Sequence, residues 1–153
     1  MKPGEPRRVL DSPWLPLGLG LVAFALYLGV RGHGFLHFDD DRYVTDNPVV
    51  RGGLSWEGLR WAFTTFAVAN WHPLAWLSHM LDVQLFGLAP GPHHLVSAAF
   101  HAANAGLLLH VLRRLTAAPG RSLAVAVLWA VHPVNVEAVA WVSERKELLA
   151  AFF

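Results

Sequence analysis

The chain has 153 residues, of which 54% are hydrophobic and 15% are charged, whereas an ordinary soluble domain has about 25% charged residues. The formal net charge of +1 excludes a broad basic surface, so no nucleic-acid partner is expected. The sequence contains no cysteine, which excludes disulfides and thiolate metal sites.

Uncharged apolar runs predict an all-α, multi-spanning helical membrane protein, with the lipid bilayer as its first partner. Residues 14–30 (WLPLGLGLVAFALYLGV) form the first run, and they are just long enough for a membrane helix, which needs about 17–25 residues. A cleaved signal peptide is the alternative. Its apolar region usually has about 7–15 residues, so we favour an uncleaved helix.

Further apolar runs follow along the chain. A second span is expected over residues 92–112, and a third over residues 122–142 with a break at Pro133, which interrupts helix propagation. Residues 148–153 begin a fourth run. We therefore expect the chain to be the N-terminal portion of a longer membrane protein.

Basic residues near the spans predict the orientation, because Lys and Arg concentrate on the cytoplasmic side. On this basis residues 1–13 and the linker 113–121 are cytoplasmic, and they carry Lys2, Arg7, Arg8, Arg113, Arg114 and Arg121. Residues 31–91 and the charged loop 143–147 then lie on the opposite, outer side. Two charged sequences, FDDDRYVTDNP (38–48) and SERKE (143–147), thus face one compartment. The membrane would be the bacterial inner membrane, which the Ala-, Gly-, Leu- and Arg-rich composition favours, or the endoplasmic reticulum membrane in a eukaryote.

The long outer segment is expected to contain two helices that lie along the membrane surface. Ser55 can cap a helix that runs to about Phe66, and Pro73 suits the first turn of another. The second helix carries an apolar stripe with three- and four-residue spacing, formed by Leu74, Leu77, Leu81 and Leu85. Trp56, Trp61, Trp71 and Trp76 favour the membrane boundary. A small soluble cap with a tryptophan core is the alternative.

A polar stripe marks the second span. Its members are spaced three, four and three residues apart, so they share one helical face: His94, Ser97, His101 and Asn104. Polar groups facing lipid are costly, and this face should look into a bundle or a wet cavity. It either lines a site or holds the helices together by hydrogen bonds.

The acidic cluster at residues 39–41 admits several interpretations. An EF-hand fails, because Val44 stands at its sixth position and Val50 at its twelfth, where Gly and Glu are needed. An irregular divalent metal site formed by Asp39, Asp40 and Asp41 stays open as a possible cofactor site, as does a channel selectivity ring. A solvated acidic turn is the plainest alternative.

General-base catalysis is the remaining interpretation of the cluster. A partly desolvated carboxylate beside another carboxylate can accept a proton from a hydroxyl group. Such a reaction with a phosphate leaving group also needs a cationic site, which Arg145 and Lys146 can supply from the same side of the membrane.

The ordered set of motifs resembles the membrane O-mannosyltransferase-like proteins that carry tetratricopeptide repeats. FDDD and TDNP come first, followed by WHPL (71–74), HHL (93–95), His101 and then AVHPVNVEAVAWVSERKELL (130–149). The resemblance implies a GT-C glycosyltransferase. Such an enzyme transfers a sugar, mannose among the candidates, from a polyprenyl- or dolichyl-phosphate donor to a hydroxyl group of an acceptor protein.

The resemblance also implies roles for individual residues. Asp39 or Asp40 would be the catalytic base. The residues that would bind the donor phosphate or line its cavity are Arg145, Lys146, Glu137, Glu147, His94 and His101. Without the remaining spans, we expect this stretch alone to be inactive. Two alternatives are a non-enzymatic scaffold whose tetratricopeptide repeats lie beyond this stretch and bind partners, and a transporter or channel subunit.

Overall fold

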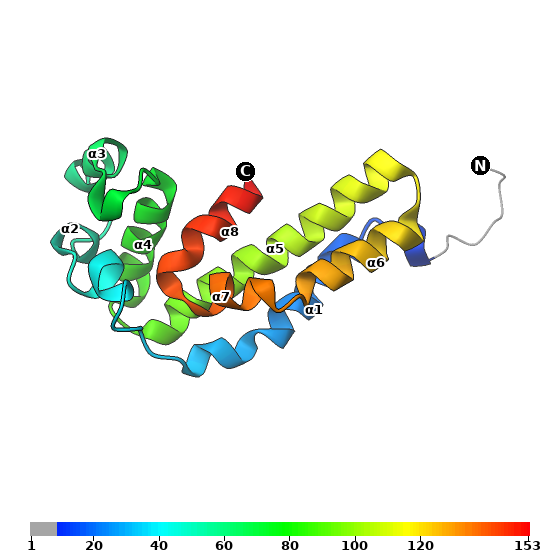
Figure 1. Cartoon of the computed structure of the whole chain (residues 1–153), viewed down its shortest axis with the longest axis horizontal. Helices are drawn as coiled ribbons and strands as arrows, with labels where there is room; N and C mark the ends of the chain where they lie inside the picture. Colours follow the sequence, from blue (N-terminus) through cyan, green and yellow to red (C-terminus); the bar gives the residue numbers. More distant parts are fainter. Residues whose placement is uncertain (1–8) are drawn as a thin grey trace.

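The computed structural model describes residues 9–153, and Lys2, Arg7 and Arg8, which helped to predict the cytoplasmic N-terminus, lie outside them. Within this range every regular element is helical and there is no strand, so the all-α prediction is confirmed (Figure 1). The molecule is elongated, with a group of short helices at one end of a long helical arm (Figure 1).

The arm contains the apolar helices. The short η1 (Val9–Asp11) leads into α1 (Leu15–Leu26), which continues through η2 (Leu28–Gly32). The long α5 (Pro90–Thr116) runs beside α1, and α6 (Pro119–Ala130) returns along it to α7 (Val134–Ala140) (Figure 1).

Two helical segments of the arm are long and apolar enough to cross a membrane, Leu15–Gly32 and Pro90–Thr116. The pair formed by α6 and α7 would make a third span, with a bend of 59°. Pro133 lies in this bend, where its missing N–H and its ring disfavour a continuous helix. The prediction of several spans is therefore confirmed in part, since two helices have the length and composition of a membrane span and a third depends on the bent pair.

Small residues let α1 and α5 approach each other closely. A Cβ atom added at Gly20 would lie 2.9 Å from the carbonyl oxygen of Ala102, and one added at Gly106 would lie 2.9 Å from that of Pro16. Such backbone contact at small residues is how membrane helices gain packing energy where the lipid offers no hydrophobic driving force.

The group of short helices at the N-terminal end of α5, which we call the cap, comes from the predicted outer segment. It consists of the π-helical turn η3 (Asp41–Thr45), α2 (Pro48–Arg51), α3 (Trp56–Thr64), η4 (Ala67–Ala69) and α4 (Pro73–Phe86). Ser55 caps α3 as predicted, since its Oγ accepts a hydrogen bond from the Gly58 N–H at 2.9 Å. Pro73 begins α4 in the predicted position.

Tryptophans occupy both of the environments considered for this segment. Trp76 is fully buried in the cap core beside Tyr43 and Met80, whereas Trp56 and Trp71 are exposed. On α4 the leucine stripe faces outward, with Leu74, Leu81 and Leu85 exposed. The opposite face of α4 is buried, and it includes His79 and Asp82.

The last elements are the short turn η5 (Val142–Glu144) and α8 (Arg145–Phe152), which lies beside α5 and α4. A charged loop was expected over residues 143–147, but Arg145 and Lys146 form the first turn of α8 instead. The reason is burial, because the Arg145 side chain is fully enclosed between α4 and α5 and finds its partners there.

Candidate functional site

Asp40 is the centre of the acidic segment. Its side chain is fully buried, and both carboxylate oxygens accept backbone hydrogen bonds. Oδ2 accepts from the Leu36 N–H at 2.9 Å, and Oδ1 accepts from the Ser143 N–H at 2.9 Å. The acidic segment and the start of the SERKE sequence, predicted to share a compartment, are therefore in direct contact.

The flanking acids are placed differently. Asp39 is half-buried, and among residues 9–153 its carboxylate has no hydrogen-bond partner. Asp41 is also half-buried, and its Oδ1 accepts from the N–H of Arg42 at 2.8 Å. Of the two candidate bases, Asp39 has a carboxylate without a hydrogen-bond partner among the described residues, whereas both oxygens of Asp40 are hydrogen-bonded and buried.

Arg145 is buried two residues beyond Ser143, and with its partners Ser78, Asp82, His93 and Ser97 it forms a cluster that we call the hub. Its Nε donates to Ser97 Oγ at 3.2 Å, and its Nη2 donates to the His93 carbonyl oxygen at 2.7 Å. Its Nη1 donates to Ser78 Oγ at 2.9 Å and to Asp82 Oδ2 at 2.5 Å. One guanidinium thus joins α8 to α4 and α5, and the geometry is that of a structural ion pair.

Burial dominates the electrostatics of this hub. It raises the pKa of Asp82, against the opposing attraction of Arg145, and it lowers the pKa of Arg145. Burial, with Arg145 as the next cause, lowers the pKa of His79 well below its ordinary value, so that ring is neutral at pH 7. Both ring nitrogens of His79 lack a hydrogen-bond partner among the described residues.

A possible metal-ligand set lies in this hub, and the acidic triplet does not form one. Ligand atoms of His79, Asp82 and His93 all lie within 4.8 Å of one another. In the described range no such group includes Asp39, Asp40 or Asp41. The guanidinium of Arg145 already neutralises Asp82 and would repel a cation, so the geometry favours an ion pair over a metal centre.

Lys146, next along α8, points elsewhere. Its Nζ lies 2.6 Å from Glu144 Oε1 and 5.5 Å from the centre of the Tyr43 ring. It also lines an apolar cavity of about 380 Å³, which is walled mainly by Phe63, Trp71, Leu74, Leu149 and Phe153. One half-buried cation therefore stands at the edge of an apolar cavity near the acidic segment.

The polar stripe of α5 is buried, and most of it binds backbone carbonyls. His94 Nε2 lies 3.2 Å from the Gly34 oxygen, and His101 Nε2 lies 2.9 Å from the Ala130 oxygen. Asn104 donates to the Leu148 oxygen at 2.9 Å. These contacts fasten chain segments to α5. Glu137 and Glu147, the other predicted site residues, are exposed, and among the described residues neither forms a hydrogen bond or an ion pair with the hub.

Sequence reasoning missed Ser78, Asp82 and His93 as partners of Arg145. A signal was present, because His79 and Asp82 lie three residues apart on α4 and off its leucine stripe, so they share the other face. That face could have been predicted to be buried. Its arginine partner is 63 residues away in the chain, which no local pattern reveals.

These features define a helical membrane protein with a buried ionic hub and an acidic segment at one end of its spans. Over most of its length the chain is similar to protein O-mannosyl-transferases, which confirms the resemblance inferred from its motifs. It is 36% identical over 137 residues to Protein O-mannosyl-transferase Tmtc2 of Drosophila melanogaster, an alignment covering 84% of this chain and 14% of the relative.

Other relatives carry the same name. The identity is 33% to Protein O-mannosyl-transferase Tmtc1 of Drosophila melanogaster, over 86% of this chain and 16% of the relative. It is 30% to Protein O-mannosyl-transferase TMTC4 of Homo sapiens, over 97% of this chain and 23% of the relative. The chain therefore spans less than a quarter of the length of these relatives. No family model and no solved structure matches it.

Proposed function

We propose that this chain forms part of the catalytic site of a GT-C membrane glycosyltransferase. The reaction is transfer of a sugar, mannose by analogy with the names of the relatives, from a polyprenyl- or dolichyl-phosphate donor to a protein hydroxyl group. The observation that carries the proposal is the hydrogen bond between Asp40 and the Ser143 backbone, which joins the acidic segment to the basic start of α8.

In this proposal Asp39 is the general base and Asp40 positions it. A base must have a free lone pair within reach of the substrate hydroxyl, and the half-buried Asp39 carboxylate meets this condition. Each oxygen of the Asp40 carboxylate already accepts one backbone N–H, and the side chain is fully buried, so a substrate hydroxyl does not reach it. Its role is to fix the backbone from which Asp39 projects.

Lys146 is the proposed partner of the donor phosphate. It lines the apolar cavity of about 380 Å³, whose walls suit a prenyl chain, and its ammonium group can neutralise a phosphate. Arg145 is less suitable, because it is fully buried and committed to Asp82, Ser78 and Ser97. It holds the start of α8 in place instead.

The reaction then follows in one balanced step. The acceptor hydroxyl gives its proton to Asp39 while its oxygen forms a bond to C1 of the sugar. The bond between C1 and the phosphate oxygen breaks, and the lipid phosphate leaves with the electron pair. Lys146 stabilises the negative charge that develops on that phosphate.

The test uses the whole reading frame that contains these residues, expressed in membranes and supplied with radiolabelled dolichyl phosphate mannose. Asp39→Asn should lower transfer by about 100- to 10,000-fold, the usual contribution of a general base. Asp46→Asn is the matched control, because Asp46 is exposed in the same segment. Wild-type transfer by Asp39→Asn would overturn the base assignment, and added EDTA would reveal whether a divalent metal takes part.

A further inference from the structure

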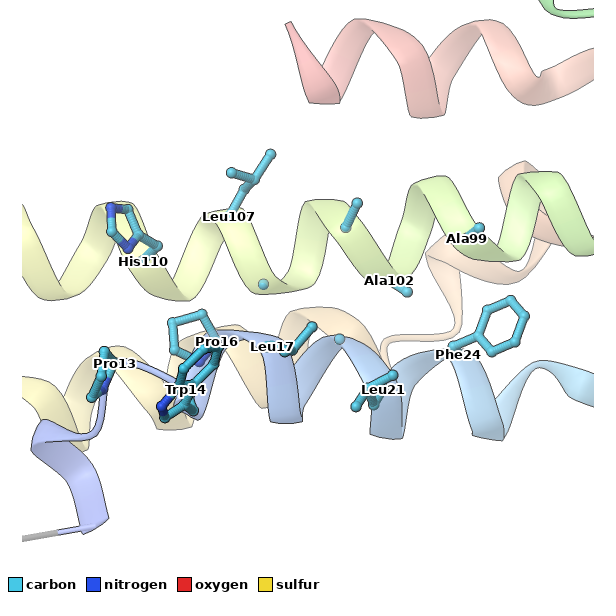
Figure 2. Close-up of a pocket in the computed structure, with 13 residues that line it drawn as sticks. Pro13, Trp14, Pro16, Leu17, Leu21, Phe24, Ala99, Ala102, Leu107 and His110 are labelled. Atoms are coloured by element: carbon cyan, nitrogen blue, oxygen red, sulfur yellow. The ribbon is translucent and has the colours of Figure 1, made fainter.

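An apolar groove runs along the arm between α1 and α5. It has a volume of about 640 Å³ and opens between side chains of both helices, including Trp14, Leu17, Leu21 and Leu107 (Figure 2). Trp14, Leu17 and Leu21 are all more than half exposed. From Trp14 to Phe24 the lined stretch of α1 is about 15 Å long, at 1.5 Å per helical residue.

A second cavity, of about 400 Å³, adjoins one end of the groove. Pro13 and His110 line both cavities, and they lie at the same end of the groove in Figure 2. The second cavity is also lined by Arg113, Arg114 and Asp11. An apolar groove thus ends in a pocket with two permanent positive charges and one negative charge.

We propose that the groove and this basic pocket together bind one glycerophospholipid with a net negative headgroup. An acyl chain would lie in the groove, and the headgroup phosphate would meet Arg113 and Arg114. Basic pockets beside membrane helices recognise anionic lipids in this way. The Arg113 guanidinium is already oriented, because its Nη1 donates to the Ser12 carbonyl oxygen at 2.9 Å, and among residues 9–153 its other donors have no partner.

This site is separate from the proposed catalytic site. His93 lies in the first turn of α5 and contacts the hub, whereas Arg113 lies in its last turn. Twenty helical residues separate them, a length of about 30 Å. Lipid binding at this end of the arm therefore does not depend on the proposed glycosyltransferase activity.

Asp11 gives the proposal a sharp test, because its carboxylate opposes an anionic headgroup. The purified chain would be exposed to phosphatidylglycerol or phosphatidylcholine in detergent micelles, and bound lipid would be counted by native mass spectrometry. We expect a preference for phosphatidylglycerol. Asp11→Asn should increase that preference, a gain that a purely structural role of this residue would not produce.

The arginine variants complete the test. Arg114→Gln should weaken phosphatidylglycerol binding about fivefold, corresponding to about 1 kcal/mol per basic residue at a membrane surface, and should leave phosphatidylcholine binding unchanged. Arg121→Gln is the matched control, because it lies near the same end of the arm but lines neither cavity. Arg114 is exposed, so its variant should fold normally. Equal binding of both lipids, an equal loss with Arg121→Gln, or competition by inorganic phosphate alone would overturn the proposal.

Discussion

Asp40 accepts a hydrogen bond at 2.9 Å from the backbone N–H of Ser143, which is 103 positions further along the chain. The contact is fully buried on both sides. It places Arg145 and Lys146, which are two and three residues beyond Ser143, beside the cap. It also distinguishes Asp40, whose carboxylate binds backbone N–H groups, from the adjacent Asp39. A sequence of three consecutive aspartates cannot reveal which of them is occupied by backbone donors.

The first prediction separates Asp40 from Asp39 by stability. An asparagine at position 40 offers one acceptor oxygen in place of two, and its NH₂ group would face either the Leu36 or the Ser143 N–H. Asp40→Asn should therefore cost about 1–3 kcal/mol of unfolding free energy. Asp39→Asn should change it by less than about 0.5 kcal/mol. Thermal unfolding in detergent measures both, and an equal destabilisation would contradict the assignment.

The second prediction concerns the ion pair of Arg145 and Asp82. Arg145→Met leaves a buried carboxylate without its cation, which should cost about 3–5 kcal/mol, whereas the double variant with Asp82→Leu should recover most of that loss. The double-mutant cycle isolates the coupling between the two residues. The Lys146→Met variant is the control, because Lys146 is only half-buried. Additive losses in the double variant would show that the two side chains are not coupled.

The third prediction tests the close approach of α1 to α5. Gly20→Ala places a Cβ atom 2.9 Å from the backbone oxygen of Ala102, so the helices must separate, at a cost of about 1–3 kcal/mol. Gly18→Ala in the same helix meets no atom within 4 Å and should keep or raise stability, since alanine favours a helix by about 0.5–1 kcal/mol over glycine. If Gly20→Ala and Gly18→Ala change the melting temperature by the same amount, the close packing of α1 and α5 is contradicted.

The architecture of the arm follows patterns that act locally. The uncharged runs and Pro133 each determine the conformation of their own neighbourhood, and the arm has the expected helices and the break there. In the cap, Ser55 likewise determines where α3 begins. The stripe on α5 also predicted an inward face, and all four of its polar side chains are buried.

The hub depends on contacts between distant segments, which the patterns do not contain. The SERKE sequence suggested a charged loop, because an arginine without known partners is expected to stay in water. Its partners on α4 and α5 lie 48 to 67 positions away, and together they offset the cost of its burial. On α4, Leu74, Leu81 and Leu85 of the leucine stripe are exposed, whereas His79 and Asp82 on the opposite face are buried.

The fourth prediction is a pH dependence caused by His79. Its pKa is lowered well below 6.5 by burial and then by Arg145, and the other groups around it are Asp82, His93, His72 and Lys146. Below pH 6.5 the unfolded chain therefore binds a proton at the His79 ring, whereas the folded chain does not. The stabilisation is complete above pH 6.5 and is lost as the pH falls below that value, by up to about 1.4 kcal/mol per pH unit.

A substitution isolates this dependence. His79→Gln removes the titrating ring, so thermal stability measured between pH 7 and pH 5 should fall less steeply than in the wild-type chain. His37→Gln is the matched control, because His37 is exposed, and it should keep the wild-type slope. An unchanged slope in His79→Gln would assign the pH dependence to other groups.

The final prediction concerns orientation in the membrane, and the cysteine-free sequence makes it simple to measure. Single cysteines at exposed positions report the side on which each segment lies. Asp46→Cys in the cap and Glu147→Cys on α8 should react with a membrane-impermeant maleimide added outside, because the Asp40 contact with Ser143 holds both segments together. Ala117→Cys, in the turn between α5 and α6, should react only after the membrane is opened. If the reagent added outside labels only Ala117→Cys, the orientation in the membrane is the opposite of the predicted one. Labelling of Asp46→Cys without Glu147→Cys would contradict the shared site itself.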